Sequence, residues 1–305
     1  MTSSTPDYSL GFTDELLASL TRNTADSSAS YLLPYLRPGL RVLDFGCGPG
    51  TITVGLARVV APGTVHGIDM EESQVELARS LAAETGVDNA VFDVADVLDL
   101  PFEDDYFDLA FCHNVLMHVP DTRAALAEVR RVMKPGGIIG CREMISRSSF
   151  THPDYGVLQH AWRIFEDVLE TDNGHPNIGK DLKRQLLAAG FNSVKATASF
   201  DFYAAPADVA FVHAFATGWF LSPEMIDAAT STGPPRRRRA LGSPRRTTGG
   251  RTTPEPSARS RSARPSPPNT RQDPPASGRT TRARSRHTGP RTEREPLRYG
   301  SLISS

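Results

Sequence analysis

Apolar residues follow two alternating patterns along the chain: short continuous runs, and longer segments in which they recur every three or four positions. The short runs are typical of buried strands and the longer spacing is typical of helices. Helices are predicted at 51–60, at 72–85 and from about 121 to just before Pro135. Strands are predicted at 41–45, 64–69, 90–94, 106–112, 138–144 and 192–203. This alternation predicts an α/β fold with a doubly wound, mostly parallel sheet, its first five strands in the order 3-2-1-4-5.

Further helical patterns flank this α/β core. They lie at 11–36, 154–172, 179–189, 206–219 and 222–230. We expect residues 1–39 and 150–175 to form a helical cap, and we interpret residues 1–232 as one domain.

A glycine-rich turn follows the first predicted strand. Gly46, Gly48 and Gly50 stand between this strand and the next helix, where glycine allows a tight turn and leaves bare main chain for a ligand. The second strand ends at Asp69, the position from which an acid binds ribose hydroxyls in dinucleotide folds. The spacing G-x-G-x-G, with Pro49 removing one amide, argues against NAD, although a nicotinamide-dependent oxidoreductase remains the alternative enzyme class.

Six motifs in order resemble one known family, the class I S-adenosylmethionine-dependent methyltransferases, which have a Rossmann-like fold. Within this family the chain is similar to the small-molecule branch that includes the ubiquinone/menaquinone C-methyltransferases. The resemblance implies methyl transfer from S-adenosylmethionine to a small organic acceptor. The matching segments are 44–50 (DFGCGPG), 67–69 (GID), 95–102 (ADVLDLPF), 107–110 (FDLA), 116–121 (LMHVPD) and 131–137 (RVMKPGG).

The resemblance also implies which residues bind the cofactor. The glycine-rich turn would wrap its methionine part, Asp69 would bind the ribose and Asp96 would accept from the adenine amino group. The alternatives are a helix N-cap for Asp69 and a simple loop acid for Asp96. Asp44 would reach the amino group of the cofactor through water. The full predicted set is Asp44, Gly46, Cys47, Gly48, Gly50, Asp69, Met70, Asp96, Val97, His113 and Asn114.

Candidates for catalysis are fewer. His118 could remove a proton from the acceptor, because histidine titrates near neutral pH; the rival interpretation is that it stabilises the loop before Pro120. Arg142 and Glu143 end the fifth strand and could face the acceptor, or could form a solvated salt bridge. Methyl transfer from a sulfonium is an in-line displacement, so positioning can supply much of the catalysis.

The composition indicates the cellular compartment and the kind of partner. No run of about 18 apolar residues is present, so no membrane span is expected, and Met1–Asp7 has no features of a secretory leader. Cys47, Cys112 and Cys141 fit free thiols in a reducing cytoplasm, and their spacing matches no metal site. The expected partner is a small-molecule acceptor; the sequence leaves the identity of that acceptor and the oligomeric state open.

The charge is divided unevenly. Residues 233–305 hold 18 arginines, no lysine and four acids, while residues 1–232 hold 16 basic and 31 acidic residues. With few large apolar residues, the 233–305 segment cannot offset the entropy of ordering, so we predict a disordered tail. A regulatory protein whose tail binds nucleic acid is one alternative, but interleaved aromatic residues are missing and nucleic acid is not the expected partner.

A shifted reading frame is the preferred explanation of this tail. One permitted encoding of residues 256–265, with two bases dropped, reads Phe-Gly-Ala-Phe-Ala-Phe-Gly-Glu-Ala, which resembles the apolar last strand of the family. That strand is normally antiparallel and lies between strands five and six. Strand six is therefore expected to lack a partner and to be an exposed or poorly ordered edge.

Overall fold

The computed structural model describes residues 12–154, 156–231 and 300–304. All of them fall in one unit, made of Met1–Pro235 and Glu295–Ser305. The predicted disorder of the tail concerns residues that, apart from 300–304, lie outside this described part of the chain. Among the described residues, no helix is long and apolar enough to cross a membrane.

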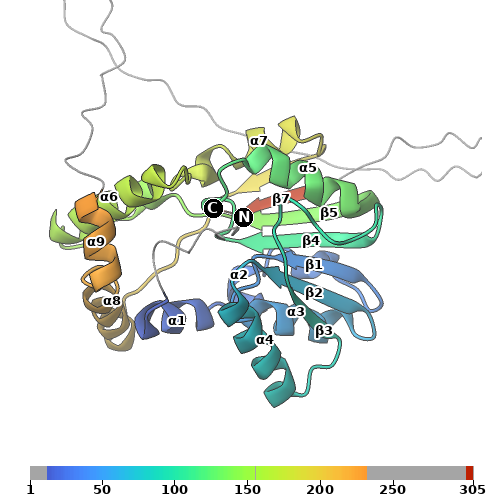
Figure 1. Ribbon diagram of the computed structural model, residues 1–305, viewed down its shortest axis with the longest axis horizontal. Coiled ribbons are helices and arrows are strands. Elements are labelled where there is room, and N and C mark those ends of the chain that lie inside the picture. Colours follow the sequence, from blue (N-terminus) through green and yellow to red (C-terminus); the bar gives the residue numbers. More distant parts are fainter. Residues whose placement is uncertain (1–11, 155, 232–299, 305) are drawn as a thin grey trace, which may run out of the picture. The chain divides into compact units, whose positions relative to one another are not determined.

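The first five strands form a parallel sheet in the predicted order 3-2-1-4-5, so the predicted fold class is confirmed (Figure 1). The fifth strand begins earlier than predicted, because Met133 already pairs with Phe107; an irregularity then separates this pair from the next one, Leu109 with Ile138. The strands are β1 (Arg41–Phe45), β2 (Thr64–Asp69), β3 (Ala90–Val94), β4 (Phe107–His113) and β5 (Met133–Arg142).

Helices cover both faces of this sheet. α3 (Thr51–Val60) and α4 (Glu72–Thr85) pack in one hydrophobic core with Val42 of β1. α5 (Thr122–Val132) packs in a second core with Leu43 and Phe45. Successive side chains of a strand point to opposite faces, so Val42 reaches the first core while Leu43 and Phe45 reach the second.

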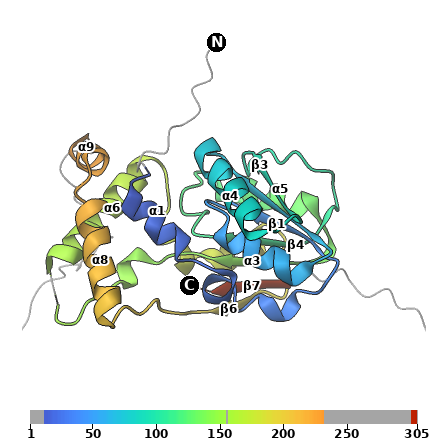
Figure 2. The ribbon, with the colours of Figure 1, turned by 90° about the horizontal axis from the view of Figure 1, so that it is seen from below.

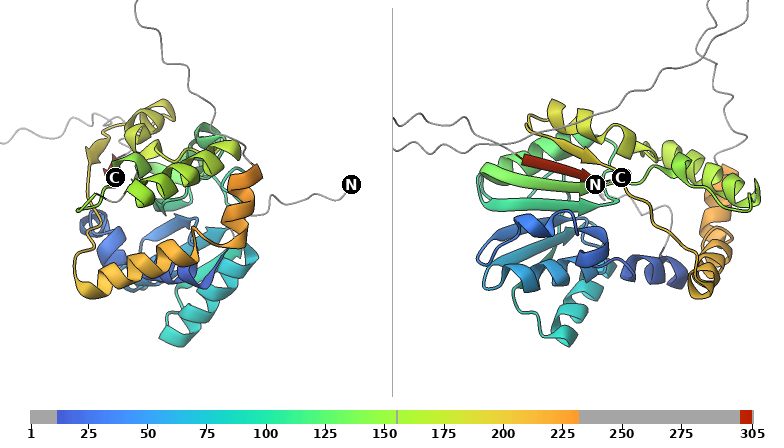
Figure 3. Two further views of the ribbon diagram at one scale, coloured as in Figure 1. Left: turned by 90° about the vertical axis from the view of Figure 1, so that its left-hand side faces the viewer. Right: turned by 180° about the vertical axis from the view of Figure 1, so that it is seen from behind.

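Of the remaining helices, α1, α6, α8 and α9 gather beyond the carboxyl ends of the strands (Figures 2 and 3), while α7 packs beside α5 and α2 packs against α3. An aromatic cluster joins α6 to the end of α8, with Trp162 edge-on to Phe220 and Phe165 beside Trp219. The elements are α1 (Asp14–Thr21), α2 (Ala25–Ser28), η1 (Leu33–Tyr35), η2 (Ser146–Ser148), α6 (Gly156–Thr171), η3 (Ile178–Lys180), α7 (Leu182–Ala188), α8 (Pro206–Gly218) and α9 (Pro223–Ser231).

The far edge of the sheet corrects one expectation. β6 (Lys195–Thr197) does have a partner, because β7 (Gly300–Ser304) lies between β5 and β6 and pairs with both. The sequence predicts that no strand fills this position, which an antiparallel strand normally occupies. β7 does fill it, and β7 is parallel to both neighbours. β6 is also much shorter than the predicted 192–203. Its ladder ends with the pair Thr197–Ser304, and the described residues 198–205 that follow Thr197 are not part of a strand.

Candidate functional site

The glycine-rich turn connects β1 to α3, as predicted, and its three glycines have left-handed φ values of +74°, +51° and +79°. A Cβ on Gly46 would lie 2.2 Å from Val115 Cγ2, and one on Gly50 would lie 2.7 Å from Ala78 Cβ. A Cβ on Gly48 would meet nothing within 4 Å. Gly46 and Gly50 therefore serve packing as well as the turn, while Gly48 presents bare backbone to open space.

Asp69 holds this turn from the end of β2. The Gly48 N–H donates to Asp69 Oδ2 at 2.9 Å, and the Glu71 N–H donates to Oδ1 at 3.1 Å. Burial raises the pKa of this carboxyl, and the backbone hydrogen bonds oppose that rise. Asp69 is not the N-cap of α4, because Glu71 occupies that position. Met70, the next residue, is 42% exposed.

Asp44 lies beneath the turn, where it is 2% exposed. Its Oδ2 accepts a hydrogen bond from Thr53 Oγ1 at 2.6 Å, which fastens the end of β1 to the first turn of α3. Burial raises the pKa of Asp44 to about 7, against the effect of the Thr53 hydroxyl. Cys47 is buried as well, and burial raises the pKa of its thiol. Both residues therefore support the turn from within.

Asp96 and Val97 lie in the loop after β3, on the same edge of the sheet. Asp96 is exposed, and its Oδ1 accepts a hydrogen bond from the Leu98 N–H at 2.9 Å. The loop is also bonded to the end of β2, because the Ala95 N–H donates to the Asp69 carbonyl at 3.0 Å. Arg131 of α5 binds the far part of this loop through the carbonyls of Leu100 and Phe102, at 3.0 and 2.9 Å. No local pattern in the sequence indicates this contact of Arg131.

Glu143 follows β5 and is buried, being 1% exposed. Its carboxylate accepts from the N–H groups of Val115, Leu116 and Met117 at 3.0, 2.9 and 3.2 Å. Burial raises its pKa to about 7, and these three hydrogen bonds oppose the rise. Neither prediction for Glu143 fits this geometry: its carboxylate is turned into the protein to hold the turn after β4, and it is not a solvated salt bridge.

His113 and Asn114 end β4 beside this turn. The Asn114 N–H donates to the Arg142 carbonyl at 2.9 Å, and Asn114 has a left-handed φ of +54°. His113 Nδ1 is buried and has no hydrogen-bond partner among the described residues. Burial, helped by Arg142, lowers the pKa of His113 to about 3. Its imidazole is therefore neutral at physiological pH.

His118 is likewise neutral, because burial lowers its pKa to about 4. Another histidine holds the loop before Pro120. The His175 N–H donates to the Met117 carbonyl at 2.6 Å, and His175 Nε2 lies 3.1 Å from the Pro120 carbonyl oxygen. His175 therefore stabilises this loop from far along the chain, and no local pattern singles it out; the two interpretations of His118 both stay predictions.

The predicted cofactor residues therefore converge on one edge of the sheet, at the carboxyl ends of β1 to β4. A methyltransferase-domain profile matches residues 36–170, a range that contains all eleven of them. Demethylmenaquinone methyltransferase of Staphylococcus aureus is 39% identical over 174 residues, which are 52% of this chain and 71% of that protein. This chain belongs to the class I S-adenosylmethionine-dependent methyltransferases.

Other methyltransferases are also similar. A probable methyltransferase of Aspergillus luteorubrus, ltbC, is 35% identical over 155 residues, covering 48% of this chain and 54% of that protein. A crystal structure of an S-adenosylmethionine-dependent methyltransferase from Aquifex aeolicus has a TM-score of 0.46 and 18% identity, covering 59% of this chain and 90% of that chain. The chain spans about half the length of the first curated relatives that it matches.

The residues present fit S-adenosylmethionine, the cofactor of this family. Open space beside Gly48 leaves room for a ligand against the backbone. Two carboxylates, Asp69 and Asp96, stand on the same edge, and each oxygen that already accepts one hydrogen bond can accept another. Among the described residues, no three His, Cys, Asp or Glu side chains form a group that could hold a metal ion.

Proposed function

We propose that this methyltransferase transfers the methyl group of S-adenosylmethionine to a small organic acceptor. The observation that carries the proposal is the turn at Gly46–Gly50, closed by Asp69 at the carboxyl edge of a parallel sheet. In such sheets ligands bind outside the carboxyl ends of the strands. The bound cofactor supplies an electrophilic methyl group on a sulfonium.

Each predicted cofactor residue has a proposed part in binding. Gly46, Cys47, Gly48 and Gly50 form the turn around the methionine portion, and Asp69 accepts from ribose hydroxyls while it holds Gly48. Met70, Asp96 and Val97 surround the adenine. The peptide between His113 and Asn114 faces the amino group of the methionine portion, and buried Asp44 supports the turn through Thr53.

The histidines offer only a weak base. A general base works best when its pKa is near the working pH, whereas the pKa of His118 is lowered to about 4. We therefore propose that His118 accepts a proton only from an acceptor that is itself acidic. Positioning carries the rest of the reaction, and Glu143 acts as a positioning residue by fixing the turn after β4.

Calorimetry with S-adenosylmethionine and with NAD(P) tests the proposal. We expect saturable binding of S-adenosylmethionine and none of NAD(P). A screen of metabolites with methyl-labelled cofactor then identifies the acceptor by transfer of the label. Tight NAD(P) binding without S-adenosylmethionine binding would refute the proposal.

A further inference from the structure

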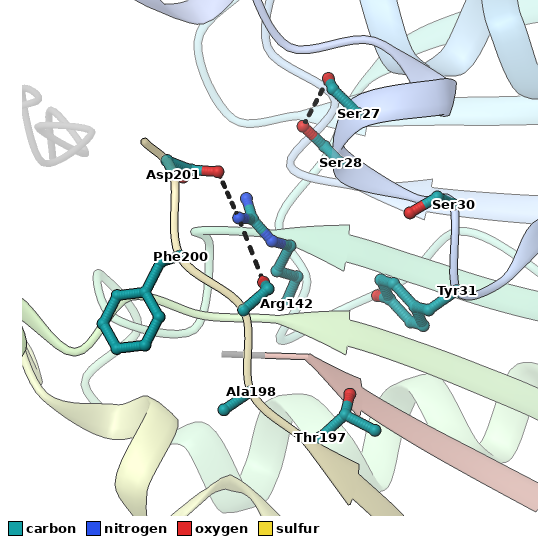
Figure 4. Close-up of a pocket in the computed structure, with 10 residues that line it drawn as sticks. Ser27, Ser28, Ser30, Tyr31, Arg142, Thr197, Ala198, Phe200 and Asp201 are labelled. Atoms are coloured by element: carbon teal, nitrogen blue, oxygen red, sulfur yellow. Dashed lines mark hydrogen bonds and ion pairs between the residues drawn. The ribbon is translucent and has the colours of Figure 1, made fainter. Parts of the chain in front are cut away.

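A cavity of about 400 Å³ lies at the carboxyl ends of β5 and β6 (Figure 4). Its walls come from three separate parts of the chain: the 27–31 segment, Arg142 and the 197–201 segment after β6. Its volume is in the range of sites for small molecules. None of the residues predicted for cofactor binding lines it, so the cavity is a separate feature.

Arg142 brings a buried positive charge to this cavity, since its side chain is only 10% exposed. In the described structure both of its side-chain hydrogen bonds leave from Nη2, to Asp201 Oδ1 at 2.7 Å and to Ser199 Oγ at 3.5 Å. A guanidinium has five N–H donors in a flat fork that matches a carboxylate or phosphate. The present partners use only one corner of that fork.

Asp201 is a weakly held partner for this charge. Its side chain is 60% exposed, and it lies in the part of the chain that has left the sheet. The neighbouring residues Phe200 and Phe202 are 71% and 84% exposed, although the Phe200 ring lies edge-on to Phe150, with the ring centroids 6.1 Å apart. Because Asp201 is exposed, an incoming anion can replace it at Arg142 and leave the Asp201 carboxylate in water.

Tyr31 independently indicates an acceptor ligand. Its hydroxyl is buried and has no hydrogen-bond partner in the described part of the chain, although buried polar groups normally have one. Burial raises the pKa of this phenol, so it keeps its proton and can donate. Tyr31 enters the cavity from the side opposite the 197–201 segment (Figure 4). An oxygen bound at Arg142 would complete this missing contact.

The cavity also lies close to the proposed reaction centre. Arg142 is paired in register with His113 on β4, and its carbonyl accepts from the Asn114 N–H. We propose that the cavity binds an anionic group of the methyl acceptor, a carboxylate or phosphate, on Arg142 and Tyr31, with Asp201 displaced toward solvent. This inference rests on the proposed function, because it names the class of substrate for the same reaction.

The test is binding of paired probes to the full chain in the presence of S-adenosylhomocysteine. Each small carboxylic acid is compared with its carboxamide and each phosphate monoester with its alcohol, by calorimetry. Acids or phosphates are expected to bind about tenfold or more tightly than their neutral partners, because each gains a charge-assisted contact. Whichever series shows the larger preference identifies the anion as carboxylate or phosphate.

Variants assign the preference to these residues. Arg142→Met should abolish it, and Tyr31→Phe should reduce it. Asp201→Asn should strengthen anion binding, because the internal competitor is removed, and this gain is one that a merely structural ion pair would not give. Arg184→Met is the control, since Arg184 of α7 forms an exposed ion pair with Asp181, the N-cap of the same helix, and does not line the cavity.

Equal binding of acids and neutral partners, an unchanged preference in Arg142→Met, or weaker anion binding in Asp201→Asn would overturn the inference. If Arg142→Met does not fold, Asp201→Asn and Tyr31→Phe still decide the outcome. S-adenosylmethionine binding is measured on the same samples. If S-adenosylmethionine binds but no preference for anions is found, this inference alone is contradicted. If anions are preferred but S-adenosylmethionine does not bind, the proposed function is contradicted and an anion site remains.

Discussion

A single carboxylate connects the ends of two strands at the cofactor turn. Asp69 accepts from Gly48 on the β1 side and from Glu71 on the α4 side. Asp69→Ala is expected to weaken S-adenosylmethionine binding by about 1–3 kcal/mol, through lost ribose hydrogen bonds and a looser turn. Calorimetry measures the effect, with Asp88→Ala, an exposed acid between α4 and β3, as the control. Unchanged affinity would remove Asp69 from the site.

Two glycines of the same turn should respond differently to alanine. Gly48→Ala meets no neighbour, so its cost is the left-handed backbone, about 1–2 kcal/mol, while the new methyl group fills the space kept for the cofactor. Gly46→Ala adds a collision with Val115, and overpacking costs about 1–3 kcal/mol more. The melting temperature of Gly46→Ala should therefore be lower than that of Gly48→Ala. Calorimetry should show lost cofactor binding in Gly48→Ala, and normal binding there would contradict the proposed place of the cofactor.

Two buried carboxyl groups, Glu143 and Asp44, are expected to make the stability of the fold depend on pH. The pKa of Glu143 is raised from 4.5 to about 7, so between these values the folded state binds more protons than the unfolded state. The free energy of unfolding should therefore fall as pH rises through this interval, and Asp44 adds to the same trend. Glu143→Gln should flatten part of the slope in urea unfolding between about pH 5 and pH 8.

Glu76→Gln, on the exposed side of α4, is the matched control and should keep the full slope. If Glu143→Gln has the same slope as the unmodified chain, the carboxyl is not the titrating group.

At the scale of elements, Arg131 couples α5 to the loop that carries Asp96. Its guanidinium donates to the carbonyls of Leu100 and Phe102 and to Glu128 and Asp104. Arg131→Met should lower stability by about 1–3 kcal/mol and also weaken cofactor binding, because the loop loses its anchor. Melting and calorimetry report the two effects. Arg123→Met, exposed on the same helix, should change neither.

The local sequence pattern was sufficient to predict those elements whose partners are near in sequence. The order of β1 to β5 and the glycine turn follow from apolar runs, connections and residues with special backbone freedom. Contacts between distant residues were not visible in this way. The pair Arg142–Asp201, the His175 contacts and the inward orientation of Glu143 depend on tertiary packing, which no single segment encodes.

For the whole molecule, the origin of residues 233–305 remains our proposal. If they come from a shifted reading frame, restoring the frame should supply a longer apolar strand beside β6 and raise the melting temperature. The gene is sequenced around the codons for residues 228–235, and the two versions are compared by melting and light scattering. An uninterrupted frame, with no gain in stability on restoration, would defeat the proposal.

The position of β7 has a consequence for the order in which the sheet forms. β4 and β5 pair after a short connection, but Ile138 meets Gly300 only after a loop of more than half the chain has closed. Closing such a loop is entropically costly and contacts of this range form slowly. The β5 edge should therefore stay open during most of folding, and β6, which reaches the sheet only through β7, should join last. While the β5 edge is open, it can pair with another folding chain. The tendency to aggregate should therefore depend more on how long this edge stays open than on the stability of the folded protein.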